Sequence, residues 1–353
     1  MDILILVIAF IVILLGAELF TNGIEWFGRK LELAEGAVGS VLAAVGTALP
    51  ETMIPIIAIG LSGSGGATNE VGIGAILGAP FMLSTLAMFV TGIGVIAFRR
   101  RRANGVRMAV DTVVLVHDIR TFALAYALAI GAAFLPPELR WAKILVAVVL
   151  LGIYAWYVKG HFEADPDVDA EDLAPLRFRH LDRRAVRMNP TVPRLRIISV
   201  QVLAALSCIV GGAYLFVGAV DHLASSLGVN AMLLALVIAP IATELPEKFN
   251  SLIWVRQGKD TLAMGNITGA MVFQSAIPTV VALLFAPDSW RVTPDSTLAF
   301  VSAGIAFASV AAVFLPMWRR ARVGGRALLV GGVLYLAYLA LVVLAITGVV
   351  SVG

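Results

Sequence analysis

Charged residues are scarce in this sequence: only 14% of its 353 residues are Asp, Glu, Lys or Arg, whereas 60% are hydrophobic. A soluble globular domain carries about 25% charged residues. Cysteine is almost absent, and the single Cys208 excludes an internal disulfide framework. Low charge and recurring apolar stretches together predict a chain embedded in a lipid bilayer.

Signatures of other protein classes are missing as well. The sequence contains no His-Glu-x-x-His and no Gly-x-Ser-x-Gly, so it lacks the common motifs of hydrolytic enzymes. Its Lys and Arg residues are not pooled in one soluble domain, as they would be in a nucleic-acid-binding protein. We therefore expect the lipid bilayer and small inorganic ions as partners, no nucleic acid and no cofactor.

Ten apolar stretches are long enough to cross about 30 Å of hydrocarbon. They predict an all-α integral membrane protein with ten transmembrane helices at 2–19, 37–60, 71–97, 121–135, 141–158, 197–221, 231–255, 261–286, 297–316 and 327–349. The first stretch has no basic segment before it and no small-residue cleavage site after it, so we expect a retained helix.

Most of the 26 Lys and Arg residues lie in every second loop, including Arg99 to Arg102 and the long polar segment 159–196. Because loops rich in Lys and Arg stay in the cytoplasm, we expect a multi-pass plasma-membrane protein with a cytoplasmic 159–196 loop and both termini outside. His117-Asp118-Ile119-Arg120, just before the fourth stretch, is expected to anchor that helix at the cytoplasmic headgroups.

The 159–196 loop separates two halves, 1–158 and 197–353, that share a sequence pattern. Gly16-Ala-Glu-Leu-Phe and Gly46-Thr-Ala-Leu-Pro-Glu51 recur as Gly212-Ala-Tyr-Leu-Phe and Ala242-Thr-Glu-Leu-Pro-Glu247, at the same spacing. A Gly-x-x-x-Gly follows in each half, at Gly74 to Gly78 and at Gly265 to Gly269. Since each half has five expected helices, the second enters the membrane from the opposite side. Such inverted repeats are typical of secondary transporters, which bind substrate between the repeats near the midplane.

Glu51 and Glu247 lie deep in two of the expected helices, each directly after a proline. An ionised carboxylate in hydrocarbon is costly unless it is paired or metal-bound. Each proline also deprives a carbonyl one turn earlier of its usual helical donor. Carboxylates, freed carbonyls and the nearby hydroxyls of Thr47 and Thr243 form the all-oxygen ligand set that hard cations such as Ca²⁺ prefer.

Two alternatives remain for Glu244 and Lys248, which lie within one helical turn of Glu247. Glu244 either adds a carboxylate to the cation site or pairs with Lys248, whose ammonium would then replace a bound cation. The second reading is favoured slightly because an unpaired lysine at this depth is costly. A purely structural role for all these charges is less plausible, because one lysine cannot neutralise Glu51, Glu244 and Glu247 together.

The two Pro-Glu motifs, Gly46 to Glu51 and Ala242 to Glu247, resemble the alpha-repeat signatures of the calcium/cation antiporter superfamily, which includes the sodium/calcium exchangers. The repeats would span about 37–97 and 231–286, and Gly265-Asn266-Ile-Thr-Gly269 is similar to the Gly-Asn-x-x-Gly of their third helix. The resemblance covers nearly the whole chain. It implies that the two glutamates are the central Ca²⁺ ligands, that the two threonines supply further oxygens, and that two long helices rock over a fixed core.

The chain departs from the family pattern at several oxygen-bearing positions. The usual serine after the threonine is Ala48 in one repeat and Glu244 in the other, and third-helix polar positions hold Leu83 and Ala270, with Gln274 one turn further on. Fewer oxygens weaken Na⁺ coordination, and a desolvated carboxylate can take a proton instead. Asn266, Gln274 and Lys248 remain possible site or charge partners.

We therefore expect a secondary active antiporter that exchanges a divalent cation, Ca²⁺ before others, for H⁺ or Na⁺ by alternating access. The alternative is a degenerate member of the superfamily that no longer transports and acts as a membrane sensor or scaffold. The lost third-helix polar residues favour that alternative. An enzyme is not expected, because glutamates and threonines offer no activated nucleophile.

Overall fold

The structure is a computed structural model that describes residues 2–30, 51–61, 66–164, 174–181, 193–243, 245–320 and 323–346. In the first half it contains α1 (Asp2–Lys30), a helical segment at 51–56 continued by η2 (Ile57–Leu61), α3 (Gly66–Met82), η3 (Leu83–Ala87), α4 (Met88–Ala97), β1 (Arg107–Met108), α5 (Thr112–Gly131), η4 (Ala132–Phe134), η5 (Pro137–Leu139) and α6 (Arg140–Ala164). After η6 (Arg177–Leu181) follow α8 (Leu195–Leu227), α9 (Ala231–Thr243), α10 (Leu245–Gln257), α11 (Asp260–Phe285), α12 (Thr297–Arg320), β2 (Val323–Gly324) and α13 (Gly325–Ile346).

Eight helical segments of the described chain are long and apolar enough to cross a membrane. Two shorter apolar helices, Glu51–Gly60 and Ala231–Ile241, lie within the other two expected spans. The expected span 231–255 is divided between α9 and α10, and its two prolines, Pro240 and Pro246, remove backbone donors on either side of that division. The prediction of an all-α multi-pass membrane protein is confirmed, whereas a count of ten spanning helices stays a prediction.

Two expected boundaries were wrong. The first span was expected to end at residue 19, but α1 continues to Lys30. The start of the fourth span was wrong by two and a half turns. The fourth span was expected from residue 121, but α5 begins at Thr112, where the side chain of Asp111 accepts hydrogen bonds from the backbone N–H groups of Val113 and Val114. This is an N-cap, and it satisfies donors that the first turn of a helix leaves without partners. The polar residues of the first turns, which suggested a loop, belong to the helix.

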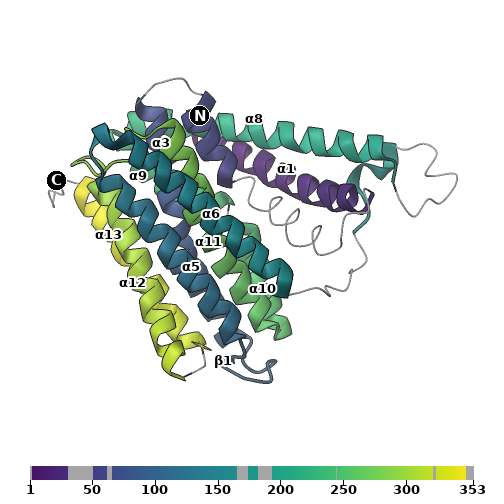
Figure 1. Ribbon diagram of the computed structural model, residues 1–353. Helices are drawn as coiled ribbons and strands as arrows, with labels where there is room; N and C mark the ends of the chain where they lie inside the picture. Colours follow the sequence, from purple (N-terminus) through teal and green to yellow (C-terminus); the bar gives the residue numbers. More distant parts are fainter. Residues whose placement is uncertain are drawn as a thin grey trace.

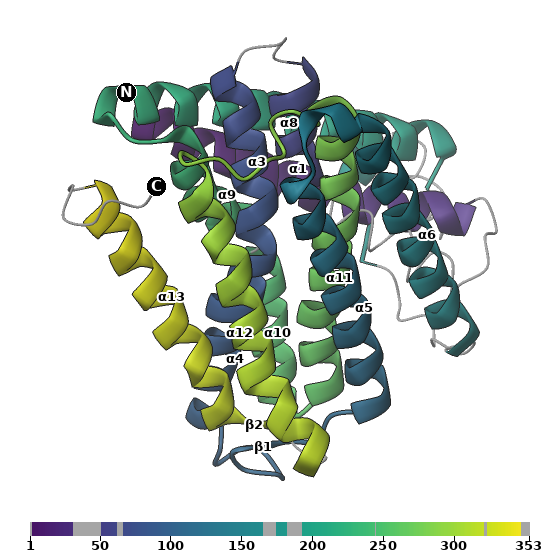
Figure 2. The same cartoon turned by 60° about the vertical axis from the view of Figure 1, so that its left-hand side comes forward.

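The two longest helices, α1 and α8, lie side by side and cross the remaining bundle at a steep angle (Figures 1 and 2). Their contact is reciprocal. Gly16 on α1 lies against Ala205 and Ile209 of α8, while Gly212 on α8 lies against the corresponding part of α1. Glycine at these points lets the two helix backbones approach closely, as small residues do between membrane helices.

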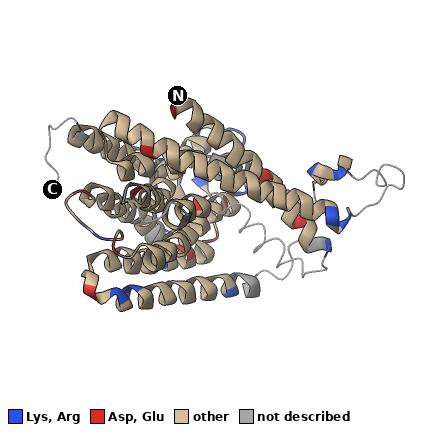
Figure 3. Cartoon of the chain, turned by 90° about the horizontal axis from the view of Figure 1, so that it is seen from above, with Lys and Arg blue, Asp and Glu red and all other residues tan. Residues whose placement is uncertain are grey.

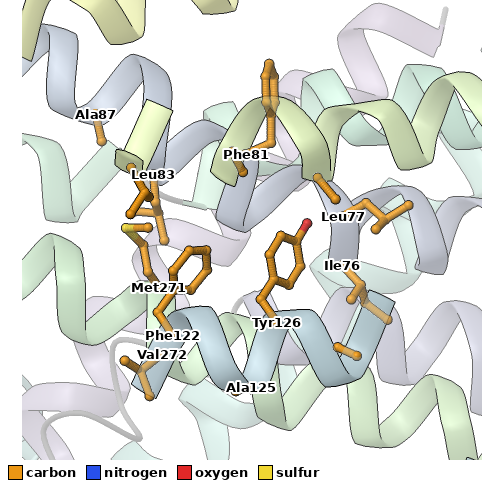
Figure 4. Packing of buried hydrophobic residues seen from close by; sticks show 14 of the residues in the cluster. Ile76, Leu77, Phe81, Leu83, Ala87, Phe122, Ala125, Tyr126, Met271 and Val272 are labelled. Carbon is orange, nitrogen blue, oxygen red and sulfur yellow. The ribbon is translucent and has the colours of Figure 1, made fainter. Parts of the chain in front are cut away.

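The bundle is centred on α3 and α11, the two spans with the most buried surface. Gly74 and Gly78 place α3 directly against the backbone carbonyls of Met232 and Leu236 in α9. On another side, Phe122 and Tyr126 project from α5 into the apolar core around α3 (Figure 4). These contacts hold the helices that carry the predicted site in a tightly packed centre.

A buried ion pair fixes the loop between α4 and α5. Arg102 and Asp260 are 2.7 Å apart, both side chains are 1% exposed, and Arg102 also donates to the carbonyl of Val255. The short strands β1 and β2 pair antiparallel, which joins the same loop to the turn between α12 and α13. The loop is therefore tied to the ends of α10, α11, α12 and α13.

Within the polar segment between the halves, the described residues 174–181 dock on the crossing pair α1 and α8. Gln201 of α8 donates to Asn22 of α1 at 3.0 Å and accepts from the backbone N–H of Phe178 in η6 at 2.8 Å. Arg177 forms an exposed ion pair with Glu18. Charged residues gather at helix ends and around this segment, while most of the helical surface is uncharged (Figure 3).

Candidate functional site

Glu51 begins the described part of the first Pro-Glu motif and is only 6% exposed. The next residue, Thr52, is buried too, and the helix turns into the π-helical η2 six residues later. Pro55 has no N–H, so the carbonyl of Glu51 cannot receive the usual bond from the residue four positions on. Irregular backbone beside a buried carboxylate is typical of ion sites inside membranes. Thr47 and Ala48 lie outside the described residues.

The second motif spans the junction of α9 and α10. Thr243 closes α9, is 3% exposed, and donates its hydroxyl to the carbonyl of Ala239 at 3.2 Å. Lys248 on α10 is buried at 6% exposure. Glu244 and the side chain of Glu247 lie outside the described part of the chain, so the choice between a shared cation site and a pair of Glu244 with Lys248 stays open.

Both motif segments pack against the same two central helices. α3 contacts η2 and α9, and α11 contacts η2 and α10. The arrangement therefore brings the buried Glu51 segment and the Thr243–Lys248 segment to the α3 and α11 core, as the sequence pattern predicts for two corresponding helices. That the two segments bind one cation together remains a prediction.

A polar seam runs between α10 and α11. Ser251, fully buried one turn after Lys248, donates to the carbonyl of Ala263 at 3.2 Å. Asn266 on α11 donates to the hydroxyl of Ser251 at 3.5 Å. Sequence reasoning named Asn266 and Lys248 but missed Ser251, although its spacing from Lys248 places it on the same helical face. Gln274, 3% exposed, lies two turns further along α11.

The corresponding region of α3 is less polar. Leu83, at the position where the family pattern has a polar residue, is completely buried in the apolar core. The neighbouring hydroxyls of Ser84 and Thr85 donate to the carbonyl of Phe81 in their own helix. In this described stretch of the first half, the hydroxyls of Ser84 and Thr85 are therefore bonded within their own helix.

The described residues contain no group of three or more His, Cys, Asp and Glu side chains that could hold a metal ion. A cation site made of Glu51 together with hydroxyl, amide and carbonyl oxygens would not count as such a group, because it contains only one carboxylate among the described residues.

The profile of the family described as sodium/calcium exchanger protein matches residues 1–160 and 198–347. The chain belongs to the sodium/calcium exchanger family. This exchanger is accordingly a membrane-embedded transporter of inorganic cations and not an enzyme.

Individual relatives are distant. A curated protein from Alkalimonas amylolytica, named putative antiporter CaxA, is 24% identical over 289 residues, covering 79% of each chain. The crystal structure of the H⁺/Ca²⁺ exchanger CAX superposes with a TM-score of 0.70 at 16% identity, covering 99% of this exchanger and 85% of that chain. A structure of the sodium-calcium exchanger NCX_Mj reaches a TM-score of 0.56 at 18% identity, covering 96% and 99%. These structures show that the fold is shared.

One interpretation of the sequence was wrong at Asp118. The segment His117 to Arg120 was expected to face the headgroups, but Asp118 is 1% exposed. It accepts hydrogen bonds from Tyr157 of α6 and Thr268 of α11. The signal that could have revealed it is the N-cap at Asp111, which moves the start of α5 back and places Asp118 inside the span.

Proposed function

We propose that this exchanger moves Ca²⁺ in exchange for H⁺ by alternating access, with Glu51 and Glu247 as its central cation-binding carboxylates. The observation that carries the proposal is the burial of Glu51 in a short, proline-containing helix at the centre of the bundle. A carboxylate kept in hydrocarbon must have its charge compensated, and a bound cation or a bound proton does so in alternation. Thr47, Thr243 and, in one reading, Glu244 would add oxygens; Asn266 and Gln274 lie on the adjoining helix.

Proton coupling is favoured over Na⁺ coupling by the residues of the third helices. Leu83 is buried among apolar side chains and Ala270 carries no oxygen, so fewer ligands remain for flanking Na⁺ ions. Na⁺ coupling is the competing outcome that a flux assay distinguishes.

Two inverted halves, 1–158 and 197–353, would supply the alternating access. The reciprocal glycine contacts of α1 and α8 support this proposal, because Gly16 and Gly212 occupy matching positions of the two halves. By the same proposal, α1 and α8 move over the core formed by the repeats 37–97 and 231–286. The 159–196 segment would lie in the cytoplasm and both termini outside a plasma membrane.

The test is Ca²⁺ uptake into proteoliposomes under an imposed H⁺ gradient, and separately under a Na⁺ gradient. We expect uptake with the H⁺ gradient and at least a tenfold loss in Glu51→Gln and Glu247→Gln. Glu138→Gln changes an exposed glutamate in η5 and serves as the matched control. Wild-type uptake in both site variants would contradict the proposed ligands.

The other outcomes are equally informative. If only a Na⁺ gradient drives uptake, the counter-ion is Na⁺ instead of H⁺, and the proposed cation site still stands. No uptake under either gradient would favour a family member that has lost transport and acts as a sensor or scaffold, a role to which the apolar Leu83 position points.

A further inference from the structure

A groove of about 200 Å³ lies between α5 and α12 and is called the α5–α12 groove below. Its lining side chains recur at helical spacing, which places each set on one face of its helix. Ala123 of α5 and Ala311 of α12 are short, so they leave space between the two helices. Arg120 and Leu315, which also line the groove, are exposed, so the groove opens on the surface of the helix bundle.

The α5–α12 groove runs from the middle of the bundle toward one end of it. It stops at Phe307, near the middle of α12, whose ring packs on Phe122 and Tyr126 with centroids 6.0 and 5.3 Å apart. At its other end lie Val116, one turn after the start of α5, and Met317, one turn before the end of α12. Both helix ends adjoin the strands β1 and β2 (Figure 2). The groove therefore lies within one leaflet, which the predicted topology makes the cytoplasmic one.

Arg120 is the one charged residue among the described side chains that line the groove. It lies eight residues after the start of α5, about 12 Å along the helix axis, and its long side chain can extend toward the headgroups. A guanidinium at this depth is costly unless an anion compensates its charge. It has five N–H donors, so contacts of Arg120 within the protein are compatible with phosphate binding. The carboxylate of Asp118 bonds to α6 and α11, on the other side of α5 from the groove.

The end of the bundle at which the groove opens is basic. Its described carboxylates outside α5 are Asp111, which caps that helix, and Asp260, which is buried and paired with Arg102. Such an end attracts anionic headgroups and repels the ammonium of a zwitterionic one. The exposed arginines that follow α4, lie in β1 or begin α13 are Arg99, Arg100, Arg101, Arg107 and Arg326.

We propose that the α5–α12 groove binds an anionic phospholipid, with part of one acyl chain between the two helices and its phosphate at Arg120. Apolar walls and one guanidinium match a ligand that has an apolar chain and a negatively charged headgroup. The bound lipid joins α5 to α12, and α12 in turn packs against α3 and α13. This site is separate from the Pro-Glu motifs and does not depend on which ions the exchanger moves.

The experiment is a lipid titration of the full chain in detergent, followed by native mass spectrometry. The probes are dioleoylphosphatidylglycerol, which is anionic, and dioleoylphosphatidylcholine, which has the same chains and no net charge. We expect the first phosphatidylglycerol to bind about tenfold more tightly than the first phosphatidylcholine, because of the basic residues at this end. Arg120→Gln should weaken the first phosphatidylglycerol about tenfold, since it removes a charge-assisted hydrogen bond, whereas Arg120→Lys retains the charge and most of the affinity.

The acyl-chain part of the site is tested separately. Ala311→Leu fills the groove and should also weaken the first phosphatidylglycerol about tenfold, because fewer methylene groups of the lipid are buried. Ala312→Leu makes the same change at an exposed neighbour outside the groove and is the matched control. Arg140→Gln, which removes an exposed arginine at the opposite end of the bundle, is the control for charge. Both controls should bind the two lipids as the wild type does.

Equal affinities of the wild type for the two lipids would overturn the proposal, as would wild-type phosphatidylglycerol affinity in Arg120→Gln or in Ala311→Leu. Competition by glycerol 3-phosphate would overturn it too, because that probe has the phosphate without acyl chains. If Arg120→Gln does not fold, the comparison of Ala311→Leu with Ala312→Leu still tests the groove. The titration requires no transport, so failure of this proposal and failure of the proposed exchange are distinguishable.

Discussion

Gly16 of α1 and Ile209 of α8 are in such close contact that a Cβ on the glycine would lie 2.9 Å from Cγ1 of the isoleucine. The converse contact joins Gly212 of α8 to Ile13 of α1, where the distance would be 2.7 Å. In each helix, therefore, a glycine contacts an isoleucine of the partner helix. A pair packed this way can move as one body over the core, as the proposed mechanism requires.

The first prediction concerns the contact of Gly212 with α1. Gly212→Val should destabilise the exchanger by about 1–3 kcal/mol, because the added side chain forces α1 and α8 apart. Gly211→Val is the matched control, since a Cβ at Gly211 meets nothing within 4 Å among the described residues. Thermal unfolding in detergent measures both, and equal melting temperatures would show that the close approach contributes nothing.

The packing of α3 on α9 gives a second prediction. Gly74→Ala places a methyl group against the backbone carbonyl of Met232, which cannot move as a flexible side chain would. We expect lower thermal stability and reduced flux, since α3 contacts both motif segments. Gly304→Ala on α12 meets no described atom within 4 Å and should be neutral or stabilising by up to about 1 kcal/mol. A wild-type melting temperature in Gly74→Ala would contradict the inferred contact.

Two ion pairs should differ sharply in their contribution to stability. Arg102→Gln leaves Asp260 buried without its guanidinium and should cost about 3–5 kcal/mol. Arg177→Gln removes the partner of Glu18, but those side chains are 52% and 58% exposed, so the change should be at most about 1 kcal/mol. Chemical denaturation compares them, and similar losses in the two variants would count against the assigned burial.

The docking of η6 predicts protease resistance. Gln201→Ala removes the bonds to Asn22 and to the backbone of Phe178, so η6 should open from α8 more often, although Arg177 still bonds to Asn22 and Glu18 of α1. Trypsin should then cleave after Arg177 and Arg179 several times faster than in the wild type. Gln257→Ala, at an exposed position closing α10, is the control. Unchanged cleavage would mean that Gln201 does not hold the segment.

Orientation can be tested with single cysteines in a Cys208→Ser background. Asn104 and Asp288 are both exposed in loops, and they lie on opposite sides of the predicted membrane. A membrane-impermeant thiol reagent added to intact cells should label Asp288→Cys but not Asn104→Cys. The reverse pattern would invert the proposed topology.

The burial of residues in the candidate site was predictable because its signals are local in sequence. A proline followed by glutamate in an apolar stretch marks both a broken helix and an expensive charge, wherever the rest of the chain lies. The burial of Glu51 and of Lys248 and the interruption between α9 and α10 follow from those few residues. Ser251 was missed because a lone serine carries no comparable penalty.

Sequence by itself therefore determined the membrane class, the family and the position of the two motifs, because apolar length and Pro-Glu spacing are properties of short segments. Only the tertiary structure decided that Asp118 is buried and that η6 docks on α1 and α8. Asp118 meets Thr268 across 150 residues of chain, and Phe178 meets Gln201 on another helix. A polar side chain near a helix end can face lipid headgroups or other helices. Which of the two occurs depends on partner residues that are distant in sequence, so a local sequence pattern does not predict it.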